Sequence, residues 1–175
     1  MRKSMLQFWV AIGLVVLLFL DGSLDYLFQG HFLVYPNMMQ SRLVVMAVVM
    51  LVFFLPKWQH QLVTLMVIGF LFDLFYTGIL GIYIFLLPLI WLFTTYIEGF
   101  FQATLPAIGA IYLIDLTLLE TMTYMLNSFM GLTDMSVATF IPSVLGMTLL
   151  LNVMLFVILY FPFRGLLLKL EMISV

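Results

Sequence analysis

The chain has 175 residues, of which 66% are hydrophobic and 8% are charged. Soluble domains carry about a quarter charged residues, so this chain cannot cover a water-facing surface and is predicted to be an integral membrane protein. It contains no cysteine, which excludes disulfides and thiolate metal sites. No polar stretch is long enough for a soluble domain. Residues 1–175 are therefore expected to form a single polytopic transmembrane domain in a lipid bilayer.

Apolar runs predict an all-α bundle of about six transmembrane helices, because a helix needs about 20 mostly apolar residues to cross a bilayer. Five runs are clear spans: Met5–Leu20, Gln61–Tyr76, Ile79–Ile97, Thr104–Leu126 and Thr139–Phe163. A sixth run, Leu43–Leu55, reaches spanning length only if it begins near Met38, and a re-entrant segment is the alternative. The first run lacks a small-residue cleavage site, so it is interpreted as a retained anchor.

The basic residues predict that both termini are cytoplasmic. With six spans, one face of the membrane receives five of them: Arg2, Lys3, Lys57, Arg164 and Lys169. The other face receives only Arg42. Cytoplasmic loops carry the excess of Lys and Arg, so the crowded face is assigned to the cytoplasm. The C-terminal tail, Arg164–Met172, is expected to lie on that surface.

The segment from Asp21 to Asn37 is predicted to be external, although it is rich in apolar side chains. Phe28 and Phe32 are two of its aromatic residues. An exposed apolar segment of this kind is typical either of a short helix in the outer head groups or of a protein docking surface.

Asp73 lies in an otherwise apolar run and needs a partner, because an aspartate at mid-membrane costs roughly 2.5 to 3.5 kcal/mol. Arg42 and Asp73 each lie fifteen positions from the turn at Lys57–Trp58, so they should share a depth near the outer surface. An ion pair between them is the hypothesis. The alternative is that each side chain reaches water at the interface independently, since exposed pairs contribute little.

Asp115 and Asn152 are both placed near mid-bilayer by counting from the last external loop. Asp115 is expected to face the bundle interior, protonated through desolvation, and to hydrogen-bond with Asn152 or a nearby threonine. A proton or solute relay is the functional alternative, since ionisable groups at this depth are functional candidates by default. Glu120, nearer the outer end of the same helix, either pairs with the outer loops or touches the interface.

Motifs of catalysis and cofactor binding are missing from the sequence. His31 and His60 fall in loops on opposite faces, so a histidine-based metal site is not expected. The chain has no Gly-x-Ser-x-Gly nucleophile elbow, no His-Glu-x-x-His and no phosphate-binding Gly-rich loop with lysine. No basic and aromatic surface indicates nucleic acid binding. An enzyme, a cofactor and a nucleic-acid partner are therefore not expected.

One local pattern resembles a known family. Gly69-x-x-x-Asp73 is followed by Gly78-x-x-Gly81 and then by an apolar helix that contains Pro88, as in the rod shape-determining protein MreD family. Chain length, about six spans and cytoplasmic termini fit that family across the whole chain.

The resemblance implies a non-enzymatic scaffold of the bacterial cell membrane. Its expected partner is MreC, a single-pass membrane protein, within an elongation complex that includes MreB, a glycosyltransferase and a transpeptidase and that supports side-wall peptidoglycan synthesis and rod shape. Asp73 and Gly78 would set the geometry of the helices that present the binding surface, with Gly81 as a turn residue. Phe28 and Phe32 would contact the partner.

The MreD family is also similar in fold to the substrate-binding subunits of energy-coupling factor vitamin transporters, which supplies an alternative function. Those subunits typically carry an Ala-x-x-x-Ala docking motif in the first helix, where this chain has only Ala11. The one such pair, Ala103 and Ala107, lies in the fifth predicted helix. This difference argues modestly against the transporter function.

Overall fold

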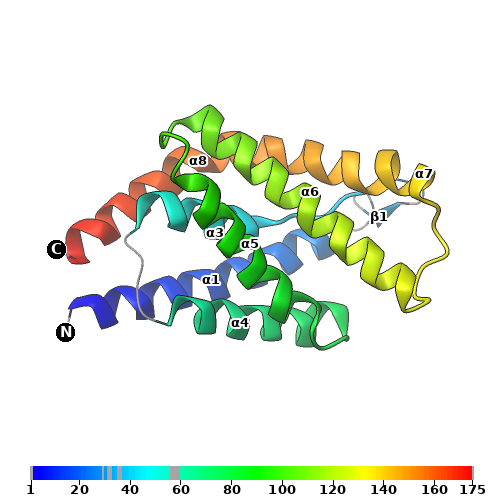
Figure 1. Ribbon diagram of the computed structural model, residues 1–175, viewed down its shortest axis with the longest axis horizontal. Helices are drawn as coiled ribbons and strands as arrows, with labels where there is room; N and C mark the ends of the chain where they lie inside the picture. Colours follow the sequence, from blue (N-terminus) through cyan, green and yellow to red (C-terminus); the bar gives the residue numbers. More distant parts are fainter. Residues whose placement is uncertain (1, 29, 31–32, 35–36, 56–59, 175) are drawn as a thin grey trace.

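The computed structural model describes residues 2–28, 30, 33–34, 37–55 and 60–174. In this part of the chain, long helices form a bundle and a small β-hairpin lies at one end (Figure 1). Helix α1 begins and helix α8 ends at the opposite end of the bundle (Figure 1).

The elements follow the apolar runs of the sequence. The helices are α1 (Arg2–Leu27), α3 (Leu43–Phe54), α4 (Gln61–Phe72), α5 (Ile82–Glu98), α6 (Leu105–Phe129), α7 (Val137–Phe140) and α8 (Gly146–Ser174). The π-helical turns η1 (Asp73–Thr77) and η2 (Ile141–Leu145) continue α4 and precede α8. The strands β1 (Leu33–Val34) and β2 (Asn37–Met38) pair antiparallel.

Among the described residues, three helical segments are long and apolar enough to cross a membrane: Leu6–Leu27, Leu105–Phe129 and Val137–Met172. Three shorter segments are also apolar: Leu43–Phe54, Gln61–Thr77 and Ile82–Glu98. The helical fold expected from the sequence is therefore confirmed and agrees with a membrane protein. Six crossings and cytoplasmic termini stay predictions.

Helix α3, the weakest predicted span, is the centre of the bundle. All residues from Leu43 to Val52 are buried, and α3 packs against α1, α5, α6 and α8. A helix that is hydrophobic all round is a buried one, which explains why its sequence shows no polar face. Its 12 residues give a length of about 18 Å, whereas a bilayer core is about 30 Å thick. Residues 39–42 are not helical, so α3 does not begin near Met38, which is the condition for this run to reach spanning length.

The external loop expected from Asp21 to Asn37 is wrong in its first part, because α1 continues through Leu27. Asp21 and Asp25 extend the buried face of α1 and bond to the chain before and at the start of α3. Phe28 follows the helix and is exposed. Phe32 lies outside the described residues.

The C-terminal tail is not a separate segment, because α8 continues without a break through Ser174. Leu167 is buried against the bundle. The guanidinium of Arg164 lies 5.8 Å from the ring centroid of Phe54 on α3. The tail therefore extends the bundle at the end where α1 begins (Figure 1).

Helices α4 and α5 approach each other closely at Gly69. A Cβ atom added at Gly69 would overlap the backbone carbonyl of Tyr83 and lie 2.8 Å from the Cα of Ile84. Because these are backbone atoms, no side-chain rotation can relieve the overlap. Gly69, the first residue of the glycine–aspartate pattern, therefore sets the distance between the two helices.

Gly69→Ala is expected to lower the stability of the protein by about 1–3 kcal/mol, the usual cost of overpacking. The thermal midpoint of the detergent-solubilised protein measures this effect. Gly13→Ala is the matched control, since a Cβ atom at this helical glycine meets nothing within 4 Å. Equal midpoints for the two variants would contradict the close helix contact.

Candidate functional site

Between β2 and α3 the chain is neither helix nor strand, and two aspartates of α1 bind its backbone. Ser41 N donates to Asp25 Oδ1 at 2.9 Å. At the start of α3, Leu43 N donates to Asp21 Oδ1 at 2.7 Å and Val44 N donates to Asp21 Oδ2 at 3.0 Å. The first N–H groups of a helix have no partner within the helix. Asp21 therefore caps α3 from a different helix.

Asn152 on α8 binds the same stretch of backbone from the other side. Its Oδ1 accepts from Arg42 N at 2.9 Å, and its Nδ2 donates to Gln40 O at 2.7 Å. The Tyr112 hydroxyl lies 3.0 Å from Asn152 Oδ1 and 3.2 Å from Arg42 O. Gln40 N completes the set by donating to Thr148 Oγ1 at 3.3 Å. Side chains of three helices thus satisfy the segment Gln40–Val44.

Arg42 is buried and paired with Glu120 on α6. Arg42 Nε lies 2.7 Å from Glu120 Oε1, and both side chains are 5% exposed. Arg42 Nη2 also donates to the Gln40 side chain. The guanidinium carbon lies 5.7 Å from the ring centroid of Phe72 and 5.6 Å from that of Tyr83, which is cation–π distance.

The expected ion pair between Arg42 and Asp73 is therefore wrong. Asp73 instead binds backbone at the start of α5, where Gly81 N donates to Oδ2 at 2.8 Å and Tyr83 N to Oδ1 at 2.9 Å. Counting from the turn predicted a similar depth for both residues but not the direction of either side chain. The buried carboxylate of Asp73 is balanced by N–H groups at a helix N-terminus, where negative charge is favoured.

Gly78 and Gly81 lie in the short connection between η1 and α5, and both have positive φ angles, of 68° and 116°. Gly78 N donates to Asp73 O at 2.8 Å and closes the π-helical turn. This region of backbone conformation is accessible mainly to glycine. The two glycines thus allow the chain to reverse so that the start of α5 meets Asp73.

Asp115 is fully buried in the bundle, as expected, but its partner is Thr94 rather than Asn152. Thr94 Oγ1 lies 2.7 Å from Asp115 Oδ2 and 2.8 Å from Ile90 O. The hydroxyl has one hydrogen, so a protonated Asp115 that donates to Thr94 satisfies both contacts. Asn152 contacts Tyr112, one turn earlier on α6. The predicted Asp115–Asn152 bond is therefore wrong, and the predicted bond to a threonine is confirmed.

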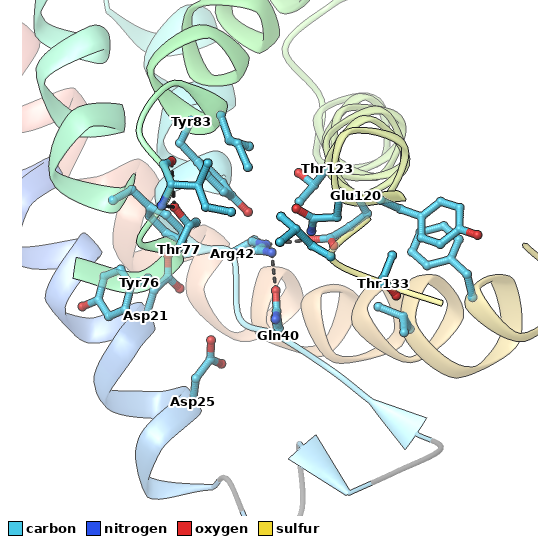
Figure 2. Close-up of a pocket in the computed structure, with 18 of the residues that line it drawn as sticks. Asp21, Asp25, Gln40, Arg42, Tyr76, Thr77, Tyr83, Glu120, Thr123 and Thr133 are labelled. Carbon is cyan, nitrogen blue, oxygen red and sulfur yellow. Dashed lines mark hydrogen bonds and ion pairs between the residues drawn. The ribbon is translucent and has the colours of Figure 1, made fainter. Parts of the chain in front are cut away.

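A cavity of about 540 Å³ opens among these polar groups. Figure 2 shows Arg42 and Gln40 in its lining, with Asp21, Asp25 and Tyr76 to one side and Glu120, Thr123 and Thr133 to the other. The lining comes from the ends of α1, α4 and α6, the turn η1, the segment before α3, the start of α5 and the stretch from Leu132 to Val144. These parts meet at the end of the bundle away from the start of α1 (Figure 1). The described residues contain no group of three or more side chains placed to hold a metal ion.

Sequence reasoning missed Asp21 and Asp25 because both were assigned to a loop. Their signal is periodicity: Leu14, Leu18, Asp21 and Asp25 follow one another at intervals of four, three and four residues. Such spacing places side chains on one face of a helix. The role of Glu120 carried no such signal, since its partner is far away in sequence.

Arg42 and Glu120 are expected to be energetically coupled. Replacing either residue alone by Met should cost about 3–5 kcal/mol, because the remaining charge stays buried without its partner. The double replacement should cost less than the sum of the two single ones. Denaturant titration of the four proteins in detergent measures this coupling energy, and strictly additive losses would count against the pair. The cycle of Arg42 with Asp73 serves as comparison and should show a smaller coupling energy.

Asp73→Ala is expected to lower the free energy of unfolding by about 1–3 kcal/mol, since it leaves N–H groups at the start of α5 without acceptors. Asp134→Ala removes the same charge from an exposed position and should change stability by less than about 0.5 kcal/mol. The same denaturant titration compares them. A loss for Asp73→Ala no larger than that for Asp134→Ala would refute the capping role.

The helical fold agrees with a membrane protein, and Gly69, Asp73, Gly78 and Gly81 lie where α4 approaches and is joined to α5. No curated protein and no solved structure matches the chain. A family model described as rod shape-determining protein MreD matches residues 2–170, nearly the whole chain. The chain therefore belongs to the MreD family.

Proposed function

We propose that this protein is a non-enzymatic membrane scaffold of the bacterial cell-elongation machinery that binds a MreC-like single-pass protein. Membership of the MreD family implies a role in rod shape determination. The observation that carries the proposal is the extent of the family match, residues 2–170. The proposed location is the cytoplasmic membrane of a bacterial cell, with several crossings. Through its partner the protein would support side-wall peptidoglycan synthesis, together with MreB, a glycosyltransferase and a transpeptidase.

The outer faces of the long helices suit contact with lipid or with another transmembrane helix. Helix α8 exposes an apolar stripe at intervals of three and four residues: Leu150, Val153, Met154, Val157, Ile158 and Phe161. The polar groups of the same helix, Thr148 and Asn152, are fully buried. A single-pass partner therefore meets an apolar surface, as a membrane helix requires.

The end of the bundle that holds the cavity also exposes aromatic and aliphatic side chains. Tyr26, Leu27 and Phe28 are 72%, 73% and 44% exposed where α1 ends. Phe129 is 93% exposed at the end of α6. Aromatic residues are enriched at protein interfaces. We propose that Phe28 and its neighbours contact the partner chain just beyond its membrane helix. Phe32 is a further candidate for this contact.

Asp73, Gly78 and Gly81 support this surface indirectly in the proposal. They fix how α5 follows α4, and α5 packs against the central helix α3. Arg42 and Asn152 hold the segment before α3. Asp115 joins α6 to α5 through Thr94. These residues are proposed to maintain the shape of the bundle rather than to touch the partner.

Phe28→Glu is expected to reduce recovery of the partner at least about fivefold, since a charge replaces an aromatic contact in the proposed interface. The experiment is affinity purification of the protein from native membranes in mild detergent, with mass spectrometry of the co-purified proteins. Phe101→Glu is the matched control, because Phe101 is 54% exposed in the connection between α5 and α6, at the other end of the bundle.

Recovery of a single-pass wall-elongation protein by the wild type, and its loss only in Phe28→Glu, is the expected result. Equal recovery by Phe28→Glu would refute the assigned surface while leaving the scaffold in place. Recovery of a pair of ATPases with a coupling subunit instead would refute the scaffold and indicate a transporter component.

A further inference from the structure

The cavity at the polar end of the bundle has the size and lining of a small-molecule site. Its volume of about 540 Å³ lies within the range of about 300–1,000 Å³ that is usual for ligand pockets. Four of its lining residues are acidic or basic, and each bonds to another part of the chain: Asp21, Asp25, Arg42 and Glu120.

Arg42 keeps N–H donors that the described residues do not use. It is 4% exposed and lines the cavity. A guanidinium carries five N–H donors, and the described residues accept from it at Glu120 Oε1 and at the Gln40 side chain. A buried cation with unused donors favours an anionic group of a ligand, because a buried N–H donor without an acceptor costs free energy.

Asp25, across the cavity from Glu120 (Figure 2), keeps one carboxylate oxygen as a hydrogen-bond acceptor that the described residues do not use. Its Oδ1 accepts from Ser41 N at 2.9 Å and lies 3.2 Å from Ser41 Oγ, whereas its Oδ2 accepts no hydrogen bond from the described residues. In Asp21 both oxygens are used by the start of α3. Figure 2 shows Asp25 across the cavity from Glu120, with Arg42 and Gln40 between them. Asp25 lines the cavity, so its Oδ2 is available to a ligand that enters the cavity.

The charges decide between ligand classes. Three carboxylates and one guanidinium line the cavity, and the guanidinium is already paired with one carboxylate. A ligand that is only anionic would meet the two remaining carboxylates, and one that is only cationic would leave the donors of Arg42 unused. A ligand that carries both charges satisfies both sides.

We propose that this cavity binds a zwitterion, with a primary ammonium on Asp25 and an anionic group on Arg42. The phosphoethanolamine group has this chemistry. It can come from the head group of a membrane lipid or from a free solute, and the two sources can be distinguished experimentally. The inference is independent of the proposed scaffold function, because it concerns the isolated chain and needs no partner protein.

The test uses the purified full-length protein in detergent, with binding followed by native mass spectrometry and by the thermal midpoint. The probes are phosphatidylethanolamine, phosphatidylcholine and phosphatidylglycerol of equal chain length, and free O-phosphoethanolamine. Phosphatidylcholine keeps the phosphate but its quaternary ammonium has no N–H donor. Wild-type protein is expected to bind phosphatidylethanolamine about tenfold more tightly than either other lipid, the usual effect of a charge-assisted hydrogen bond.

Asp25→Asn is expected to abolish this preference, because the amide oxygen can still accept from Ser41 while the negative charge is lost. Asp134→Asn is the matched control and should behave like the wild type, since Asp134 is exposed and does not line the cavity. Thermal midpoints of the lipid-free variants check that both fold.

Selective binding of the lipid without binding of free O-phosphoethanolamine would support the proposal with a lipid as the source. Binding of the free compound would support it with a soluble zwitterion. Equal binding of the three lipids by the wild type and no binding of the free compound would overturn it, and so would a preference that persists in Asp25→Asn. The lipid comparison on the wild type holds even where a variant fails to fold.

Discussion

The structure depends on the hydrogen bonds that other helices make to the backbone of the non-helical segment before α3. Within a bilayer core, a backbone N–H or C=O group without a partner costs several kcal/mol, so non-helical backbone survives there only where protein surrounds it. Here Asp21 and Asp25 come from α1, Tyr112 from α6, and Asn152 from α8. A short segment thus ties together three helices that are far apart in sequence. The central helix can be short and uniformly apolar because the N–H groups at its start are hydrogen-bonded by other helices.

The same end of the bundle concentrates the buried charges, and each is balanced locally. Asp73 is balanced by the start of α5, Asp21 by the start of α3, and Arg42 by Glu120. Helix N-termini attract negative charge, so two of these carboxylates need no cation. The ion pair with Glu120 then balances the buried charge of Arg42. Its position beside the cavity leaves part of its bonding capacity open, which is the basis for a ligand as opposed to a purely structural role.

Family membership bears on the assembly in which this protein acts, whereas the geometry bears on the chain itself. The family match places it in rod shape determination, which concerns an assembly of proteins. The cavity lies within a single chain, and its proposed ligand is a small zwitterionic group. The ends of α1 and α6 line the cavity and also expose the side chains of the proposed partner surface, so both proposed sites lie at the same end of the bundle.

The sequence by itself determined the class of protein, the family and most of the helices, because hydrophobic runs and the glycine–aspartate pattern are local signals. It also indicated that Asp115 is buried, since the residue lies in the middle of an apolar run. Only the tertiary structure decided which polar residues meet. Depth along the membrane can be counted from a turn, but the direction of a side chain around its helix and the neighbour on that side cannot. Arg42 therefore meets Glu120 rather than Asp73, and Asn152 meets the backbone before α3 rather than Asp115. The burial of α3 was equally hidden, because an apolar helix has the same sequence whether lipid or protein surrounds it.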